Sequence, residues 1–292
     1  MPNSLHFIKP RLQHHYQCAR RLLYYSKMKI PFSKAQANGN DFILFHDPEL
    51  QGEIRNPKVI QALCHRRFGI GADGILIALS SKDHDFNLEY YNSDGSWETL
   101  CANGSRCAVQ FLYQKGQIEK EMAFEAGDGL HRAEVLSSSL VKLSMNTPKY
   151  ETDLVAVSGF EGYHIDSGAP HFVCQIEELN EEFVLNAARK IRRADIFQPR
   201  GINVNFYKPL KNGSIEIKTY EKGVEKVMLS CASGSTAVVY HLSQSAGLIS
   251  PVTTISAGGK LKFTFDSIWK EPWMEGPAKI LFTSEIDIKD FI

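Results

Sequence analysis

The sequence has 292 residues, which is long enough for two domains, and its 43% hydrophobic content can supply two cores. Its 33 basic and 33 acidic residues give a formal net charge of zero, which argues against a general electrostatic attraction to nucleic acid or to anionic membranes. No apolar run approaches the roughly eighteen residues that span a bilayer. We therefore expect a globular protein with a small-molecule partner, no nucleic-acid partner and no membrane partner.

Residues 1–29 differ in composition from the rest because they contain basic residues and no acidic one. Organelle-targeting peptides share this composition, but we interpret the segment as an N-terminal extension that is not part of the fold. The six cysteines of the chain are too sparse for the disulfide framework of a small secreted domain, which favours a cytoplasmic location. Four of them are expected to be small buried side chains: Cys18, Cys64, Cys107 and Cys174.

The first strong helix signal is Asn56-Pro57, an N-cap residue followed by proline at the first helical position. It predicts a helix that ends near Gly69. A strand is expected next, at residues 74–79. The alternation of apolar and polar residues at 86–90 predicts a second strand, which ends in the turn Asn92-Ser93-Asp94-Gly95.

A short stretch that begins at Cys101 occurs twice in the chain. Cys101-Ala102-Asn103-Gly104-Ser105 returns 130 positions later as Cys231-Ala232-Ser233-Gly234-Ser235, and seven of fourteen positions are identical between 101–114 and 231–244. Each copy follows an alternating strand and a loop, and each is followed by apolar residues at helical spacing. The repeat predicts two similar half-domains, each with one cysteine at the start of a helix.

The remaining segments predict mainly β-structure. Strands are expected at 122–126, 134–145, 164–166, 172–176, 215–219, 260–265 and 278–282, and a charged surface helix at 178–193. This pattern predicts an α+β fold of two pseudo-symmetric half-domains, each a mixed, mostly antiparallel barrel-like sheet around a central helix, with the active site in the cleft between them. We expect the half-domains at 30–148 and 149–276, with 277–292 returning to the first.

Two cysteines at helix starts point to acid/base chemistry. The N-terminus of a helix has unsatisfied N–H groups and a partial positive charge, which favour a thiolate and bind a carboxylate. With an α-carboxylate held between two such ends, one sulfur can remove the α-proton while the other returns a proton to the opposite face. This arrangement would invert an amino-acid stereocentre without a cofactor.

Two other kinds of site are disfavoured. Zinc bound by Cys101, Cys107, His171 and Cys231 would lack the short ligand spacing of common structural zinc sites. Gly69-Ile70-Gly71-Ala72-Asp73-Gly74 matches the glycine pattern of dinucleotide sites, but it follows a predicted helix and precedes a predicted strand, which is the reverse of the required order. We expect no metal and no nucleotide.

Seven motifs in order resemble the diaminopimelate epimerases, which are cofactor-independent two-cysteine enzymes of lysine and peptidoglycan precursor synthesis. The likeness covers nearly all of residues 30–292. The motifs are Phe32-Ser33-Lys34 with Gly39-Asn40-Asp41-Phe42, Gly69-Ile70-Gly71-Ala72-Asp73-Gly74, Asn92-Ser93-Asp94-Gly95-Ser96, Cys101-Ala102-Asn103-Gly104-Ser105-Arg106-Cys107, Gly168-Ala169-Pro170-His171, Gly201-Ile202-Asn203-Val204, and Tyr220-Glu221-Lys222-Gly223 leading to Ser230-Cys231.

The resemblance implies an isomerase that interconverts LL- and meso-diaminopimelate by two-thiol α-proton exchange. It implies Cys101 and Cys231 as the acid/base pair, with His171 and Glu221 as supporting catalytic residues. The implied substrate contacts are the backbone N–H groups of Ala102, Asn103, Ala232 and Ser233 for the α-carboxylate, and Asn40, Asn92, Asn203, Glu221 and Lys222, especially for the distal groups.

The chain departs from the usual family motifs near the expected pocket. Ala37, Ala102 and Ala232 stand where glycine is usual, and Lys222 stands where arginine is usual, so a point-like ammonium replaces a bidentate fork. Two alternatives therefore stay open: a pyridoxal-independent racemase of another amino acid, and a catalytically silent amino-acid-binding homologue. A homodimer is compatible with the sequence, which does not determine the oligomeric state.

Overall fold

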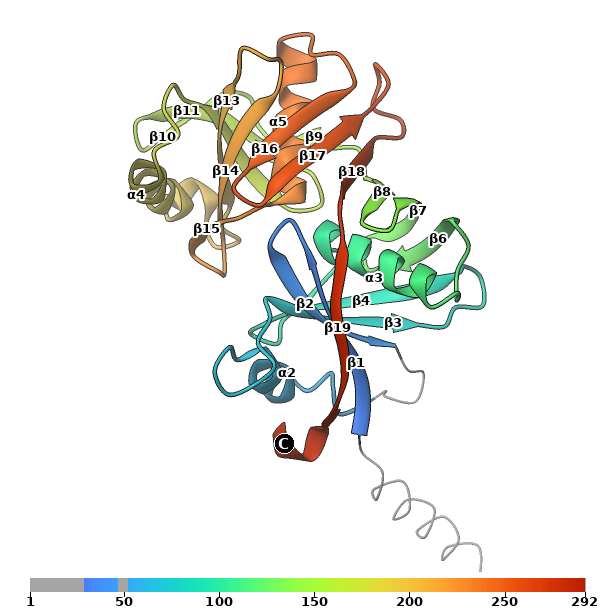
Figure 1. The fold of residues 1–292 in the computed structure, drawn as a ribbon. Coiled ribbons are helices and arrows are strands. Elements are labelled where there is room, and N and C mark those ends of the chain that lie inside the picture. Colours follow the sequence, from blue (N-terminus) through green and yellow to red (C-terminus); the bar gives the residue numbers. More distant parts are fainter. Residues whose placement is uncertain (1–28, 47–51, 292) are drawn as a thin grey trace, which may run out of the picture.

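The computed structural model describes residues 29–46 and 52–291. The predicted extension, apart from Lys29, and Cys18 lie outside the described residues. The described chain forms two lobes, one above the other in Figure 1, and each lobe surrounds one central helix. The central helices are α3 (Ala102–Gln114) in the first lobe and α5 (Ala232–Ser245) in the second.

The first lobe is built from the N-terminal half of the chain and one strand from the C-terminal end. Its elements are β1 (Lys29–Ala37), β2 (Asn40–His46), α2 (Pro57–Cys64), β3 (Gly74–Leu79), β4 (Phe86–Asn92), β5 (Trp97–Glu98), β6 (Glu121–Ala126), β7 (Gly129–Ser137), β8 (Leu140–Ser144), β19 (Lys279–Asp287) and the 3-10 helix η2 (Ile288–Phe291). Helix α3 packs against β1, β2, β7 and β8, and its buried side includes Val109 and Leu112.

The second lobe repeats this arrangement with the segment between β8 and β19. Its elements are β9 (Lys149–Tyr150), β10 (Val155–Val157), β11 (Phe160–Asp166), β12 (Pro170–Gln175), α4 (Glu181–Arg192), the 3-10 helix η1 (Asp195–Phe197), β13 (Asn203–Pro209), β14 (Ile215–Glu221), β15 (Lys226–Met228), β16 (Val252–Ser256), β17 (Gly259–Thr264) and β18 (Trp273–Pro277). Helix α5 packs against β12, β13 and β17.

The strand pairings show that the two lobes share one topology. β2 and β3 are parallel neighbours joined through α2, and β12 and β13 are parallel neighbours joined through α4. β4 and β6 are parallel neighbours joined through α3, as β14 and β16 are through α5. The other pairings in both lobes are antiparallel. The predicted fold, an α+β arrangement of two pseudo-symmetric halves, is therefore confirmed.

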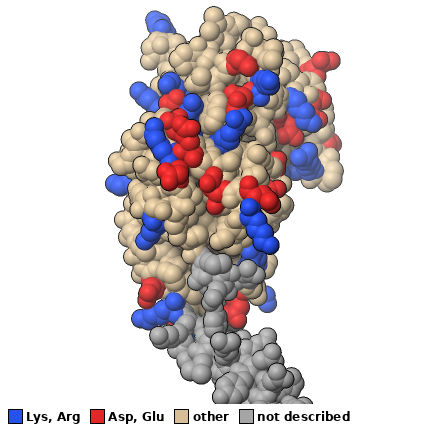
Figure 2. Space-filling view, turned by 90° about the vertical axis from the view of Figure 1, so that its right-hand side faces the viewer, with Lys and Arg blue, Asp and Glu red and all other residues tan. Residues whose placement is uncertain are grey.

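The backbone connects the lobes by strand pairing and by one crossing strand. The edge strands β8 and β18 pair antiparallel, with Leu143 opposite Met274. After β18 the chain runs from the upper to the lower lobe as β19, the long red strand in Figure 1, which pairs with β1. One continuous sheet therefore runs through both lobes. On the face shown in Figure 2, basic and acidic side chains lie interspersed, in keeping with the balanced composition.

Two local expectations need comment. The single strand predicted at 134–145 is wrong, because the chain turns between β7 and β8 and forms a hairpin. The turn contains serines rather than glycine or proline, and the Ser139 N–H donates to Ser137 Oγ at 3.3 Å. The hairpin of β1 and β2 was not expected, although its turn, Asn38-Gly39, has the positive φ angles (52° and 81°) that this dipeptide adopts readily.

Within the described part of the chain, no helix is long and apolar enough to cross a membrane.

Gln110 offers a test of the packing around α3. Its side chain is fully buried, and neither amide atom has a hydrogen-bond partner among the described residues. A buried polar group without a partner costs about 1–3 kcal/mol. We expect Gln110→Met, which keeps the unbranched shape, to raise the free energy of unfolding by about 1–2 kcal/mol in urea titrations.

The control is Gln114→Met, one turn later on the same helix, where the side chain is exposed and donates to the Ser138 carbonyl at 3.5 Å. Its effect should stay within about 0.5 kcal/mol. Equal effects of the two substitutions would show that the buried amide is not the source of the gain.

Candidate active site

The two repeated cysteines occupy the same structural position in their lobes. Cys101 is the N-cap of α3, with φ −127° and ψ 104°, and Cys231 is the N-cap of α5, with φ −126° and ψ 112°. Each sulfur accepts a hydrogen bond from the backbone N–H three residues later, at 3.5 Å from Gly104 and 3.4 Å from Gly234. The repeat in the sequence is therefore a repeat of an N-cap geometry in which sulfur replaces the usual oxygen.

Burial controls the acidity of both thiols. It raises the pKa of Cys101 to about 12 and also raises the pKa of Cys231, and the N–H donors of Gly104 and Gly234 oppose this only in part. The N–H groups at the helix starts therefore favour the thiolates, as expected, but burial outweighs them and the net pKa shift is upward. The cost of desolvating an anion exceeds the gain from the helix N-terminus. Each thiol needs a nearby base or further hydrogen-bond donors to ionise.

The two helix starts lie close together. The side chain of Asn103, on the first turn of α3, donates to the carbonyl of Ser230, just before Cys231, at 3.5 Å. Besides burial, the negative charge of Glu221 in the second lobe raises the pKa of Cys101 in the first lobe as well as that of Cys231. The structure therefore places both thiols within the electrostatic range of one carboxylate.

Glu221, the last residue of β14, is a candidate base. Burial raises its pKa to about 7, a hydrogen bond with the Cys231 thiol lowers it, and the Asp73 carboxylate raises it slightly. A carboxyl group that titrates near neutral pH can accept a proton from a neighbouring thiol and return it. The Glu221 carboxyl group and the Cys231 thiol are therefore hydrogen-bonded neighbours.

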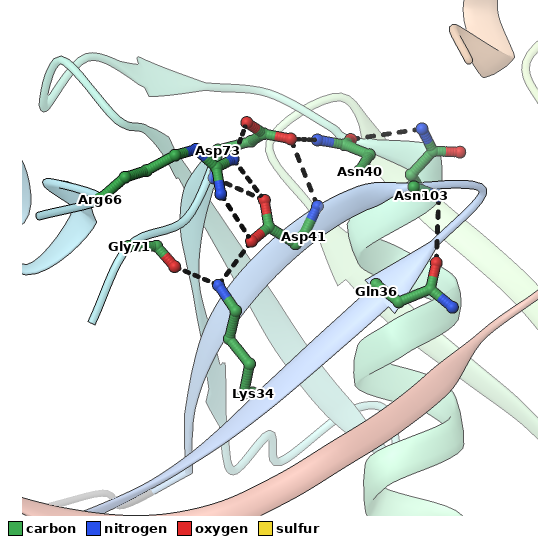
Figure 3. Close-up of polar contacts among 9 residues, drawn as sticks. Lys34, Gln36, Asn40, Asp41, Arg66, Gly71, Asp73 and Asn103 are labelled. Atoms are coloured by element: carbon green, nitrogen blue, oxygen red, sulfur yellow. Dashed lines mark hydrogen bonds and ion pairs between the residues drawn. The ribbon is translucent and has the colours of Figure 1, made fainter. Parts of the chain in front are cut away.

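Asn40 connects Cys101 to a second set of polar contacts. The Cys101 thiol donates to Asn40 Oδ1 at 3.8 Å. The Asn103 amide donates to the same oxygen at 3.3 Å (Figure 3). The other end of the Asn40 amide, Nδ2, donates to Asp73 Oδ2 at 2.7 Å. Because Asp73 can only accept, the Asn40 oxygen is held toward the thiol.

Asp73 is itself fixed by an ion-pair cluster at the start of β2 and just before β3 (Figure 3). Arg66 Nη2 contacts Asp73 at 2.6 Å and Asp41 at 2.7 Å. The buried ammonium of Lys34 pairs with Asp41 at 2.7 Å and donates to the Gly71 carbonyl. The glycine-rich motif at 69–74, which was rejected as a nucleotide site, therefore positions a carboxylate behind Asn40.

Arg106 fixes the orientation of Asn103. The guanidinium is fully buried where α3 meets the crossing between the lobes, and it donates to Asn103 Oδ1 at 2.9 Å, to Asn38 Oδ1 at 2.8 Å and to the Pro277 carbonyl at 3.4 Å. With its oxygen held by Arg106, the Asn103 amide can only donate toward Asn40 and Ser230.

The other predicted substrate contacts, Asn92, Asn203 and Lys222, make hydrogen bonds near the ends of β4 and β14. Asn92 Oδ1 accepts from the Tyr90 hydroxyl at 2.7 Å, and the pKa of Tyr90 is raised by burial and by the charges of Cys101 and Glu221. Tyr90 was missed from the sequence, where it is only an alternating strand residue. Asn203 Oδ1 accepts from the Lys222 N–H at 2.9 Å, which fixes the turn after β14.

His171 and Ser233 lie beside Cys231. His171 Nε2 is 3.0 Å from Ser233 Oγ, and Ser233 Oγ is 3.5 Å from the Cys231 sulfur. Burial lowers the pKa of His171 to about 3, so the ring is neutral at physiological pH.

The three alanines that replace glycine fit their positions without backbone strain. Ala102 and Ala232 are the first residues of α3 and α5, and Ala37 is the last residue of β1. All three are buried, and none is among the described non-glycine residues with positive φ. The N–H groups at 102–103 and 232–233 precede the first intrahelical donors, the N–H groups of Ser105 and Ser235, which bond to the Cys101 and Cys231 carbonyls. They therefore make no helix bonds and can bind an anion.

Comparison with known proteins gives a consistent result. The family described as "Diaminopimelate epimerase" matches residues 32–151 and 163–281. The chain is 36% identical over 258 residues to the diaminopimelate epimerase of Flavobacterium psychrophilum, covering 87% of this chain and 98% of that protein. It is 34% identical over 271 residues to the diaminopimelate epimerase of Aquifex aeolicus, covering 87% and 97%.

Two solved structures share the fold at low sequence identity. A hydroxyproline epimerase from Agrobacterium vitis with bound trans-4-hydroxy-L-proline has a TM-score of 0.69 and 15% identity, covering 89% of this chain and 93% of that chain. A PhzF-family phenazine biosynthesis protein from Bacillus anthracis has a TM-score of 0.67 and 12% identity, covering 89% and 99%.

Proposed function

Because the chain belongs to the diaminopimelate epimerase family, we propose that it is an isomerase that interconverts LL- and meso-diaminopimelate. The reaction serves lysine and peptidoglycan precursor synthesis. The observation that carries the proposal is the pair of helix N-caps, Cys101 and Cys231, that lie close together and near one half-buried carboxylate.

The substrate α-carboxylate would bind the free N–H groups at the starts of α3 and α5. Glu221 first takes the thiol proton of Cys231, and the resulting thiolate removes the α-proton. The Cys101 thiol then donates its proton to the opposite face of the planar carbon. The helix ends stabilise the charge that develops on the carboxylate. In the reverse direction the two sulfurs exchange roles.

The distal end of the substrate would lie toward Asn92, Asn203 and Lys222. Diaminopimelate carries an amino group and a carboxylate at that end, and Lys222 is half-buried. Burial is the main cause of the lowered pKa of His171, and the positive charge of Lys222 lowers that pKa further, so Lys222 lies near the His171 ring. A lysine offers one positive charge for the carboxylate, and the amide side chains supply the remaining hydrogen bonds.

The protein would work in the cytoplasm, where thiols stay reduced. All five cysteines in the described ranges, 29–46 and 52–291, are free. An enzyme whose acid and base are both thiols depends on such a compartment because oxidation of either sulfur removes a proton carrier.

The direct test is proton exchange in heavy water. Purified protein incubated with LL-diaminopimelate in D₂O is expected to yield meso-diaminopimelate with deuterium at one α-carbon. Mass spectrometry measures the deuterium, and chiral separation measures the conversion between the isomers. The control is the same assay with proline, 4-hydroxyproline, glutamate, aspartate and lysine, which should not exchange.

The outcomes separate the proposal from its alternatives. Rapid exchange of another amino acid, with none of diaminopimelate, would favour a racemase of different specificity. Tight binding of diaminopimelate without exchange would identify a binding protein that lacks catalysis.

A further inference from the structure

A row of polar side chains, Thr219, Asn205, His171 and Ser233, leads from the interior of the second lobe to the Cys231 sulfur. Thr219 Oγ1 donates to Asn205 Oδ1 at 2.8 Å, and Asn205 Nδ2 lies 2.9 Å from His171 Nδ1. The row continues through Ser233, which lies between His171 and the sulfur. Thr219, Asn205 and His171 are buried, so water does not compete for these bonds. We call this set the polar row.

The direction of each hydrogen bond in the polar row follows from the two groups that orient Asn205, the Thr219 hydroxyl and the Phe172 carbonyl, which only accepts. The Thr219 hydroxyl donates to an amide oxygen, so the Asn205 oxygen points toward β14 and its NH₂ group points toward β12. That NH₂ group lies against two acceptors, His171 Nδ1 and, at 3.2 Å, the Phe172 carbonyl. An NH₂ group only donates, so His171 Nδ1 must be unprotonated.

The tautomer of His171 then determines whether Ser233 donates a hydrogen bond to the Cys231 sulfur. With Nδ1 unprotonated, the ring hydrogen of neutral His171 is on Nε2, which donates to Ser233 Oγ. Because Ser233 Oγ accepts that bond, its own hydrogen is left to point at the Cys231 sulfur, 3.5 Å away. A donor at this position stabilises the thiolate relative to the thiol.

The glycine of the second repeat makes room for the polar row. A Cβ at Gly234 would collide with Asn205 Oδ1 and would lie 3.1 Å from Thr219 Oγ1. At the equivalent Gly104 of the first repeat, a Cβ would meet the Leu76 side chain at 2.7 Å. The same glycine therefore faces polar groups in one lobe and a leucine in the other, so the environments of the two thiols differ.

We propose that Asn205 and Thr219 are positioning residues that hold His171 in its Nε2–H tautomer and thereby direct the Ser233 hydroxyl hydrogen at Cys231. Neither residue touches the sulfur. The proposal deepens the proposed function and rests on it only in taking Cys231 as an acid/base group. It gives His171 the role of a fixed donor at Nε2 rather than that of a base.

The test compares Thr219→Val with Thr219→Ser. Valine removes one of the two groups that orient Asn205, the other being the Phe172 carbonyl, and it leaves Asn205 Oδ1 without a donor. The amide then gains the freedom to rotate and offer its oxygen to Nδ1, which selects the other tautomer. Serine keeps the hydroxyl. We expect the ¹⁵N chemical shifts of His171 to report the change of tautomer in Thr219→Val and the wild-type tautomer in Thr219→Ser.

The same variants should differ in the acidity of Cys231. In a Cys101→Ala background, the pH dependence of alkylation of Cys231 by iodoacetamide measures the thiol pKa without any turnover. We expect that pKa to rise by roughly one unit in Thr219→Val, with a roughly tenfold lower kcat for α-proton exchange in the two-thiol enzyme. In Thr219→Ser, the Cys231 pKa and kcat should both stay at the wild-type values.

Two further variants complete the experiment. Thr254→Val changes a buried threonine of the neighbouring strand β16, outside the polar row, and should leave both measurements unchanged. Asn205→Asp keeps the size of the side chain but removes the donor to His171 Nδ1, so it should also change the His171 tautomer. This variant replaces Thr219→Val in the test if Thr219→Val does not fold.

A wild-type His171 tautomer in folded Thr219→Val or Asn205→Asp would overturn the proposal. So would equal shifts of the Cys231 pKa in the valine and serine variants. Absence of diaminopimelate exchange in the wild-type enzyme would instead contradict the proposed function and leave these two measurements valid.

Discussion

Replacement of either repeated cysteine by alanine is expected to lower kcat for α-proton exchange at least about a thousandfold, because general acid/base groups contribute about 10²- to 10⁴-fold each and inversion requires both. Cys101→Ala should leave no proton donor for one face, and Cys231→Ala should leave no base for the other. The measurement is deuterium incorporation at the α-carbon, together with the rate of conversion between LL- and meso-diaminopimelate.

The matched control is Cys107→Ala, on the same helix as Cys101 but fully buried in the core of the first lobe. It should retain kcat within a few-fold, although it loses some stability because a small cavity forms. If Cys101→Ala and Cys231→Ala both exchanged deuterium at the wild-type rate, the two-thiol mechanism would be wrong whatever the substrate.

Glu221→Gln should produce the second largest loss and a change in the pH profile. Burial raises the pKa of Glu221 to about 7, so the carboxyl group is protonated and cannot accept the Cys231 proton below that pH. In the wild-type enzyme, kcat/KM should therefore rise with pH and level off above about 7. The glutamine variant should lose this dependence and about 10²- to 10⁴-fold in kcat.

Glu216→Gln, on the same strand β14, is the control for the loss of one negative charge. It should keep the rise in kcat/KM through about pH 7. A Glu221→Gln enzyme with the wild-type pH profile would exclude Glu221 as the group that titrates.

The sequence repeat was sufficient to predict the pseudo-symmetric fold and the place of both cysteines. Two matching copies of cysteine, glycine and serine before a helical pattern indicate two segments with one local structure, and the two N-caps have it. The positions of Cys101 and Cys231 as N-caps follow from that pattern. The hairpin of β7 and β8 could not be predicted from the sequence, because the serines at 137–139 interrupt the strand without the glycine or proline that usually marks a turn.

The electrostatics of the site could not be predicted from sequence position. A helix start predicts a lowered thiol pKa, and burial reverses that effect for Cys101 and Cys231. Burial depends on contacts between the lobes, which no local pattern encodes. Asn205 and Thr219 are similarly invisible in the sequence because each is one residue in an ordinary strand, and their role arises from the pairing of β12, β13 and β14.

The return of β19 to β1 has a consequence for the order in which the protein is made. Ser33 pairs with Thr283, which is 250 residues further along the chain, so the ribosome must synthesise nearly everything else before that edge of the first lobe can close. The strands of the second lobe, by contrast, follow one another without interruption between residues 149 and 277. The lobe that begins first is therefore completed last, and β1 keeps an open edge during synthesis. Pairings of such long separation form slowly, and open strand edges promote aggregation.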